Sequence, residues 1–254
     1  MIYIFTALKC EGEPLRLFEK DDLKVIVTGV GKTNMAFALG RTFPEGSTRR
    51  SLVNDIVINI GCCCAKSLQG VYLINKITDQ ASSRDFYPDM LRVTGIKEAA
   101  LITTDTLVTE PEEDVLYDME ASSFYETASR LLSPDRIITL KIVSDSGNTD
   151  GITTSYITSL VNDHIDQIGE VIAVLRSGMT EREDEADIEL IYTMLHATEA
   201  MKVQLDELIN YARLTDADIN KLISEEINSI CEDKELTKAQ GKEVLKRVRD
   251  KLTS

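Results

Sequence analysis

Two carboxylates follow segments of the chain whose composition is typical of buried strands. Glu11 comes shortly after residues 2–8, and Asp145 comes shortly after the apolar residues 137–143. Because strand ends line the ligand crevice of an open α/β sheet, we expect both side chains to border a binding site.

Two further carboxylates stand in residues 117–121, Tyr-Asp-Met-Glu-Ala. This segment opens a predicted helix over 118–132, so Asp118 and Glu120 would lie beside the helix N-terminus. The simplest interpretation is that both charges complement the helix dipole. A role in ligand binding is the alternative.

Residues 29–33, Gly-Val-Gly-Lys-Thr, lie between a predicted strand and a predicted helix and superficially resemble a phosphate-binding loop. The full motif needs a glycine five residues before Gly31, where this chain has Ile26, so the spacing does not match. The two glycines permit a tight turn from strand to helix. The same turn exposes backbone N–H donors at a helix N-terminus to a ligand.

The chain has five cysteines, of which Cys62, Cys63 and Cys64 are adjacent. An odd number with adjacent members does not indicate a disulfide framework and is typical of a reducing compartment. The two histidines, His164 and His196, lie far from any C-x-x-C pattern, so we expect no metal site. The three adjacent cysteines then predict a tight turn of small side chains packed against a sheet.

Six short apolar segments predict strands, at residues 2–8, 23–28, 55–60, 70–77, 99–103 and 136–143. Helices are predicted from residue 33 and over 118–132, and residues 153–175 carry apolar side chains at the 3.6-residue spacing of one helix face. Strands buried on both faces that alternate with helices are typical of a mostly parallel or mixed sheet. The sequence therefore predicts an α/β fold, a three-layer sandwich around a central mixed sheet.

The composition changes after residue 178. All five prolines and twelve of the thirteen glycines lie before residue 179, and the rest of the chain contains only Gly241. We therefore predict an α/β domain over 1–178 and an all-α extension over 179–254.

The extension is predicted to hold three helices. The first spans about 183–213, and capping patterns at Thr215 and Thr237 begin two more. The acidic runs at 181–185 and 232–235 are interpreted as solvated faces. Since the apolar side of the first helix must be buried, the extension forms a small bundle or a docking arm.

The charge of the chain narrows the classes of partner. The sequence contains 28 basic and 43 acidic side chains, a net charge of −15. We expect no nucleic-acid partner, because no basic excess is left to release counterions from a polyanion. We expect no membrane span either, because no apolar run reaches about 18 residues. The first eight residues lack a basic leader, which indicates a cytoplasmic protein.

Five segments, taken in order, resemble successive motifs of the superfamily of nucleoside phosphorylases and methylthioadenosine/S-adenosylhomocysteine nucleosidases. They are 7–11 (Ala-Leu-Lys-Cys-Glu), 28–32 (Thr-Gly-Val-Gly-Lys), 59–62 (Asn-Ile-Gly-Cys), 118–121 (Asp-Met-Glu-Ala) and 143–145 (Val-Ser-Asp). The resemblance covers roughly residues 1–178, and the extension has no counterpart in the usual family domain. It implies a phosphorylase-like fold.

The resemblance also implies an activity, cleavage of the N-glycosidic bond of a purine nucleoside through an oxocarbenium-like sugar. Asp145, placed by Ser144, would protonate the departing purine as a general acid. Glu11 would orient and deprotonate the attacking water. No metal or organic cofactor is implied.

The same motifs imply the contacts of the sugar. Glu120 would accept hydrogen bonds from the vicinal ribose hydroxyls, Met119 would form an apolar floor, and Val30 would face the far end of the sugar. Gly61 and Cys62 would form the backbone turn against the substrate.

The acceptor of the sugar is either water or phosphate. Phosphorylases of this superfamily generally bind phosphate through arginine, whereas this chain has Asn59 at that position and Cys62 where a hydroxyl commonly stands. A neutral amide is a poor substitute for the bidentate guanidinium. Together with Glu11, this favours hydrolysis, with phosphorolysis as the alternative.

Four positions depart from the family pattern. Asp118 is one methylene shorter than the expected glutamate, Lys141 replaces an arginine, Leu107 replaces a base-stacking aromatic, and Cys64 replaces a glycine. The resemblance implies that Asp118, Lys141 and Leu107 nevertheless belong to the substrate-binding residues. Weaker stacking on the purine follows from Leu107. The second hypothesis is therefore a catalytically weak nucleoside-binding protein whose extension contacts a partner or builds an oligomer.

The expected partners are accordingly few. The ligand is a small-molecule purine nucleoside. Residues 82–89 would shape the rim of its pocket or form a solvent-exposed loop. Family members are commonly dimers or hexamers, so we expect a homo-oligomer.

Overall fold

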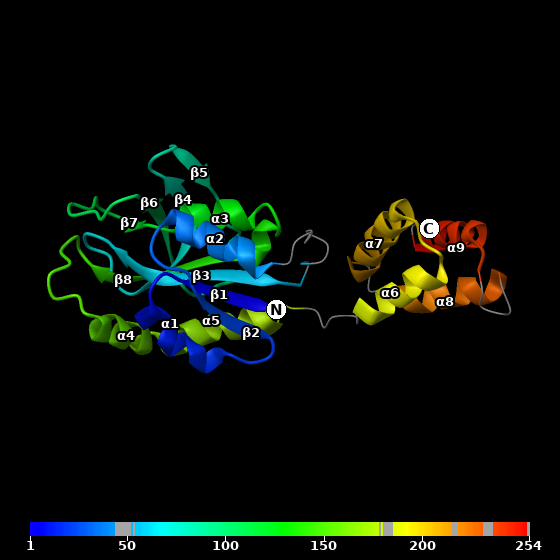
Figure 1. Ribbon diagram of the computed structural model, residues 1–254, viewed down its shortest axis with the longest axis horizontal. Helices are drawn as coiled ribbons and strands as arrows, with labels where there is room; N and C mark the ends of the chain where they lie inside the picture. The colour runs from blue at the N-terminus through cyan, green and yellow to red at the C-terminus, as the bar shows by residue number, and fades with distance from the viewer. Residues whose placement is uncertain are drawn as a thin grey trace. The chain divides into compact units, whose positions relative to one another are not determined.

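The computed structural model describes residues 1–43, 52, 54–177, 179, 185–214, 218–230 and 236–252. The chain divides into two compact units, Met1–Thr180 and Glu181–Ser254, which are coloured along the chain in Figure 1. Within the described part, no helix is both long enough and apolar enough to cross a bilayer.

The first unit is built on one mixed sheet. Its eight described strands are β1 (Ile2–Thr6), β2 (Leu23–Val27), β3 (Ile56–Cys64), β4 (Val71–Asp79), β5 (Arg84–Phe86), β6 (Lys97–Thr103), β7 (Val115–Asp118) and β8 (Ile137–Asp145). Strands β2, β1, β3 and β8 run parallel to one another. The side chains of β1, β3 and β8 are mostly apolar because both faces of the sheet are covered.

Five of the strands close into a ring. Strand β8 pairs with β3 on one side and with β4 on the other, β4 pairs with β6, β6 with β7, and β7 returns to β3. At the point of closure, Cys64 is in register with both Tyr117 and Asp145. The closure therefore brings together the ends of β3, β7 and β8, which are far apart in the sequence.

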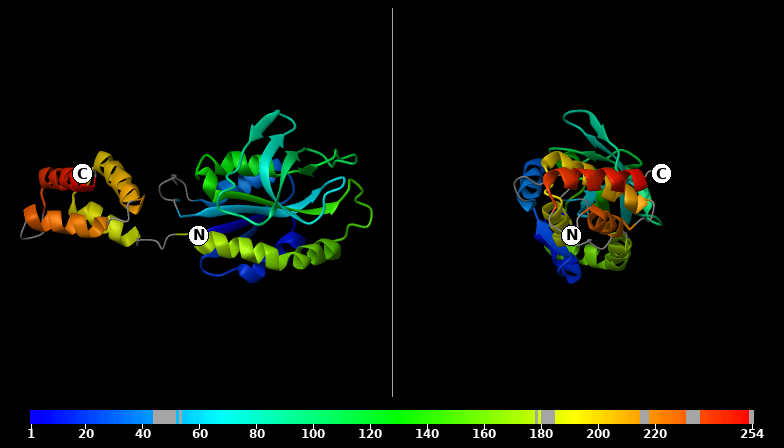
Figure 2. Two further views of the ribbon diagram at one scale, coloured as in Figure 1. Left: turned by 180° about the vertical axis from the view of Figure 1, so that it is seen from behind. Right: turned by 90° about the vertical axis from the view of Figure 1, so that its right-hand side faces the viewer.

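Helices cover both faces of this sheet, and the predicted three-layer α/β sandwich is confirmed (Figure 1). Helices α2 (Lys32–Thr42) and α3 (Ala121–Ala128) lie on one face. The other face is covered by α1 (Lys9–Leu15), α4 (Thr154–Asp163) and α5 (Ile165–Ser177). Seen from behind in Figure 2, the yellow-green α4 and α5 and the green α3 lie on opposite sides of the strands.

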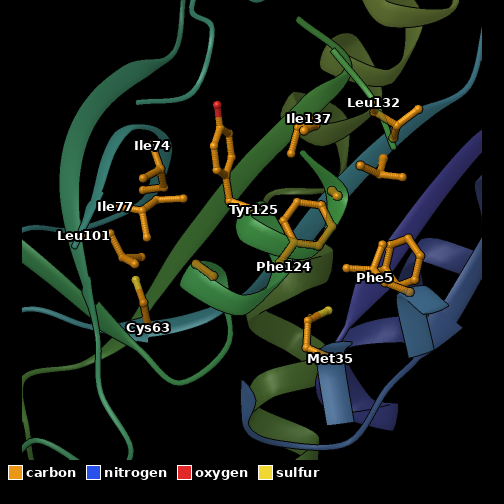
Figure 3. Packing of buried hydrophobic residues seen from close by; sticks show 14 of the residues in the cluster. Phe5, Met35, Cys63, Ile74, Ile77, Leu101, Phe124, Tyr125, Leu132 and Ile137 are labelled. Atoms are coloured by element: carbon orange, nitrogen blue, oxygen red, sulfur yellow. The ribbon is translucent and has the colours of Figure 1, made fainter. Parts of the chain in front are cut away.

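Each face has its own hydrophobic core. Under α2 and α3, Phe5 of β1 packs against Phe124 with ring centroids 5.9 Å apart, and Met35 lies beside them (Figure 3). The opposite core joins the other face of the strands to α4 and α5 through residues such as Ile58 and Val161. Two buried faces fix the sheet and with it the strand ends that carry the site.

Several local predictions are wrong. The three cysteines do not form a turn but extend β3, because their backbone pairs along β8. Residues 117–118 end strand β7 instead of opening a helix, which begins only at Ala121. The predicted helix over 153–175 is interrupted at His164, and neither α1, with its internal Pro14, nor β5 was predicted.

The second unit is a small helical bundle. Its described helices are α6 (Glu185–Met194), α7 (Glu199–Leu214), α8 (Ile219–Ile230) and α9 (Lys238–Leu252). They bury a core of their own, including Leu195, Leu205, Ile223 and Val244. Of the two forms predicted for the extension, the bundle is the one that the structure has.

The bundle departs from the three predicted helices at one place. The segment 183–213 is two helices, because His196 adopts a left-handed φ of 45° between them. The capping pattern at Thr237 is confirmed, since Gln240 accepts the Thr237 N–H at 2.8 Å. The predicted helix start at Thr215 and the acidic runs at 181–185 and 232–235 lie outside the described side chains.

Candidate functional site

A cavity of about 220 Å³ lies where β3, β7 and β8 converge. Its wall takes residues from the ends of these strands, from α1, from the turn before α2 and from the loops after β6 and β8. This is the strand-end location at which open α/β sheets bind ligands.

The cavity brings together nine of the eleven residues predicted for the site. They are Glu11, Val30, Cys62, Leu107, Asp118, Met119, Glu120, Ser144 and Asp145. The other two, Gly61 and Lys141, do not line it. Gly61 lies behind the wall, where an added Cβ would come within 3.3 Å of Glu11 Oε1.

Glu11 is a buried carboxylate held by two backbone donors. The N–H of Cys62 donates to Oε1 and the N–H of Leu8 donates to Oε2, both at 2.8 Å. The Leu8 bond forms because Glu11 is the third residue of α1 and reaches back to the start of its own helix. Since each carboxylate oxygen has a second lone pair, Glu11 can still accept a bond from a molecule in the cavity.

Glu120 is likewise held by a backbone donor, here from the glycine turn before α2. Its Oε1 accepts the Gly31 N–H at 2.7 Å, which leaves Oε2 for a ligand. Burial first, and then the negative charge of Asp118, raise the pKa of Glu120, while Lys141 and the Gly31 bond act in the opposite direction.

Lys141 and Asp118 form a buried ion pair beneath the cavity. Lys141 Nζ lies 2.7 Å from Asp118 Oδ2, and neither side chain is more than 1% exposed. Burial alone would lower the pKa of Lys141, but the charges of Asp118, Glu120 and Glu11 raise it overall. The predicted contact of Lys141 with the substrate is therefore wrong, because its ammonium group is enclosed by protein.

Asp118 borders the cavity, but its oxygens are engaged inside the protein. Besides Lys141, it accepts bonds from Thr103 Oγ1 at 2.7 Å and from the Ala121 N–H at 2.8 Å. These bonds tie the start of α3 to β6 and β8. Asp118 thus fixes the start of α3, next to Glu120, and is less available to bind a ligand directly.

Asp145 is positioned by its two neighbours in the chain. Ser144 Oγ donates to Oδ2 at 2.8 Å, and the Gly147 N–H donates to Oδ1 at 2.9 Å. Gly147 has a left-handed φ of 93°, and a Cβ there would lie 2.5 Å from the Thr109 carbonyl oxygen. The loop after β6 therefore packs directly on the turn that holds Asp145.

Tyr117 is a site residue that the sequence analysis missed. It lines the cavity, it is buried, and it belongs to neither hydrophobic core of the first unit. Cys64 of β3 lies between Tyr117 and Asp145, because it is in register with Tyr117 of β7 on one side and with Asp145 of β8 on the other. Leu107, at the predicted stacking position, is 68% exposed. Burial raises the pKa of Tyr117, and burial followed by the charge of Asp145 raises that of Cys64 to about 11.

The charge of the wall is negative. The residues that line the cavity include four carboxylates and neither lysine, arginine nor histidine. Across the described residues, no three or more His, Cys, Asp or Glu side chains are grouped so that they could hold a metal ion. The site is thus suited to neutral or cationic ligands.

Comparisons with known proteins place this geometry in a known fold. No family model matches the sequence, and no curated protein matches it. Among solved structures, CT263 (MTAN) of Chlamydia trachomatis matches with a TM-score of 0.53 and 18% identity, over 70% of this chain and 98% of its own. A methylthioadenosine/S-adenosylhomocysteine nucleosidase of Colwellia psychrerythraea in complex with adenine matches with a TM-score of 0.52 and 14% identity, over 68% and 95% of the two chains.

These matches span almost the whole of the solved chains. The resemblance seen in the sequence motifs is therefore confirmed for the fold: this chain shares the α/β fold of these solved nucleosidases. It also has a C-terminal helical part.

Proposed function

We propose that this protein hydrolyses the N-glycosidic bond of a purine nucleoside. The observation that carries the proposal is that Glu11, Glu120 and Asp145 line a single cavity. Structures of CT263 bound to methylthioadenosine and to adenine have the same fold, with TM-scores of 0.53. They support a purine nucleoside as the class of ligand.

Asp145 is the proposed general acid. A purine leaves the sugar far more readily as a neutral base than as an anion, so a proton must reach it as the bond breaks. The bonds from Ser144 and Gly147 fix the direction of the carboxyl group. Tyr117, which lines the same cavity, supplies an aromatic surface on which the base can stack.

Glu120 is the proposed acceptor for the ribose hydroxyls. Positive charge develops on the sugar as the bond to the base lengthens, and a fixed carboxylate stabilises that charge without having to reorient. The Gly31 N–H occupies one Glu120 oxygen and turns the other toward the cavity. Met119, next to it in the chain, provides the apolar surface beneath the sugar.

Glu11 is the proposed base for the attacking water. Its two backbone bonds immobilise it, and it borders the cavity together with Glu120. A water bound to Glu11 would thus be held near the anomeric carbon, which raises its effective concentration there.

The charge of the wall favours water over phosphate as the acceptor. A phosphate dianion would face the carboxyl groups of Glu11, Glu120 and Asp145, and the lining contains no lysine or arginine to neutralise it. Lys32, which follows the glycine turn, is already paired with Asp79 and Asp105. Hydrolysis is therefore the better-supported reaction, and phosphorolysis is the alternative.

A second candidate is a nucleoside-binding protein that turns over slowly. The exposure of Leu107 favours it, because this side chain leaves one face of the base without an aromatic partner. For either function we expect a homo-oligomer in the cytoplasm. Sedimentation of the purified protein tests its oligomeric state.

The test is release of free base from methylthioadenosine, S-adenosylhomocysteine, inosine and adenosine, with and without phosphate. Hydrolysis predicts release that does not depend on phosphate and that is lost in Asp145→Asn. Strict dependence on phosphate would identify phosphorolysis. Calorimetric binding without release over hours would identify the binding protein.

A further inference from the structure

The first residue of α2 is a lysine that the proposed reaction does not use. Lys32 Nζ lies 3.0 Å from Asp79 Oδ2 and 2.7 Å from Asp105 Oδ1. Asp79 is the last residue of β4, and Asp105 lies in the loop after β6. One ammonium group thus connects the glycine turn to two other segments of the first unit.

Asp79 is itself firmly held. Its Oδ1 accepts the N–H and the hydroxyl of Ser82, and its Oδ2 accepts the hydroxyl of Ser122 in α3, each at 2.8 Å. Although burial opposes it, these bonds and the one from Lys32 lower the pKa of Asp79. The hydrogen bond to Asp105 is the main cause that raises the pKa of Lys32. Both partners are therefore charged at neutral pH.

The ion pairs of Lys32 with Asp79 and Asp105 lie beside the proposed sugar site. Gly31, which precedes Lys32, donates its N–H to Glu120 Oε1 at 2.7 Å. Ser123 Oγ donates to the Lys32 carbonyl oxygen at 2.7 Å, so main chain and side chain of Lys32 are both anchored near α3. Val30 before it and Thr104 beside Asp105 line the cavity.

We propose that Lys32 is a positioning residue for the sugar-binding carboxylate. Its ion pairs with Asp79 and Asp105 hold the glycine turn so that the Gly31 N–H stays on Glu120 and directs the free Glu120 oxygen at the ribose hydroxyls. Gly31 has a left-handed φ of 98°, and nothing lies within 4 Å of its Cβ position, so side-chain packing does not hold this residue. Hydrogen bonds from the Gly29 N–H to the Ala7 carbonyl oxygen (3.1 Å) and from Asn34 Nδ2 to the Val30 carbonyl oxygen (2.7 Å) also hold the turn, and the ion pairs of Lys32 add to them. The inference rests on the proposed function.

The test compares Lys32→Met with Lys32→Arg and with Lys24→Met, an exposed lysine of β2 that does not line the cavity. Each variant is assayed for kcat/KM on a purine riboside and on the matching 2′-deoxyriboside. Displacing a positioned group by about 1 Å costs on the order of 100-fold, so we expect a loss of this size for Lys32→Met on the riboside. The loss on the deoxyriboside is smaller, because one of the hydroxyls that Glu120 binds is absent.

The preference for riboside over deoxyriboside therefore falls in Lys32→Met. It is retained in Lys32→Arg, which keeps the charge, and in Lys24→Met. Adding Lys32→Met to Glu120→Gln costs little beyond Glu120→Gln alone, because both changes remove the same contact. A folded Lys32→Met that keeps the sugar preference, or loses activity equally on both sugars, overturns the inference.

The failure of the inference and that of the proposed function are separable. If the wild type releases no base, the proposed hydrolysis is wrong, and the same comparison is made on dissociation constants by calorimetry. A fall in riboside preference in Lys32→Met then still supports the positioning role. If the wild type binds neither nucleoside, both proposals are overturned.

Discussion

Replacing Lys141 by methionine tests the buried ion pair beneath the cavity. Methionine is close to lysine in length and shape, so the change removes a charge without opening a large cavity. Lys141 and Asp118 are at most 1% exposed, and their charged atoms are 2.7 Å apart. Lys141→Met therefore leaves the Asp118 carboxylate buried without its cationic partner.

The expected loss of stability is large. Removing one member of a buried pair costs about 3–5 kcal/mol, because the remaining charge is uncompensated. Glu120 and Glu11 lose the attraction of the same ammonium group, which places the loss toward the upper end of that range. For a unit of this size, the corresponding fall in Tm is roughly 6–20 °C.

Hydrogen exchange of peptides from β3 and β8 measures this loss within the first unit alone. A destabilisation of about 3–5 kcal/mol speeds the exchange of globally protected amides by roughly two to three and a half powers of ten. The control is Lys66→Met. Lys66 forms an ion pair with Glu113, and the two side chains are 55% and 57% exposed. Such an exposed pair contributes little to stability, because solvent screens its charges.

Equal exchange rates in Lys141→Met and Lys66→Met would refute this reasoning. They would mean that Asp118 does not depend on Lys141, and that Lys141 is free to reach a ligand as the sequence motif implied.

Three further changes test other parts of the site. Gly147→Ala meets the Thr109 carbonyl oxygen at 2.5 Å, so the turn that holds Asp145 must move, and kcat should fall on the order of 100-fold in a base-release assay. Tyr117→Leu should weaken binding of the purine base by roughly 1 kcal/mol in calorimetry, whereas Tyr117→Phe should not, because the ring and not the hydroxyl carries the contact. Glu120→Gln should raise Tm at pH 7.5 but not at pH 4. The pKa of Glu120 is raised above its ordinary 4.5 in the folded protein. Its contribution to stability is therefore highest below pH 4.5, falls as the pH rises from 4.5 through the raised pKa of the folded protein, and is lowest when the group is ionised. No gain in Tm at pH 7.5 would contradict the proposed cost of that buried charge.

The sequence motifs found most of the cavity because its acidic residues stand next to apolar strands. Asp145 ends β8, Glu120 follows β7, and Glu11 follows β1 by five residues. Each of these residues lies close in sequence to the strand that positions it, and a sequence motif can therefore identify it. The three layers were predictable for the same reason, since hydrophobic periodicity reflects burial of each element.

The features that the sequence did not reveal depend on contacts between distant segments. Strand β7 has only four residues and is fixed by pairing with β6 and by the closure of the sheet at Cys64, so Tyr117 could not be placed. The partner of Lys141 could not be identified from the sequence, because Asp118 lies 23 positions earlier in the chain. A mid-strand lysine between apolar neighbours was the one available signal of a buried ion pair.

The most direct test of the central claim is base release in phosphate-free H₂¹⁸O, with the products analysed by mass spectrometry. The account predicts free purine and a sugar that carries one ¹⁸O atom from the solvent, with formation of both strongly reduced in Asp145→Asn and in Glu11→Gln. Release of unlabelled sugar, release only after phosphate is added, or an unchanged rate in folded Asp145→Asn would contradict it.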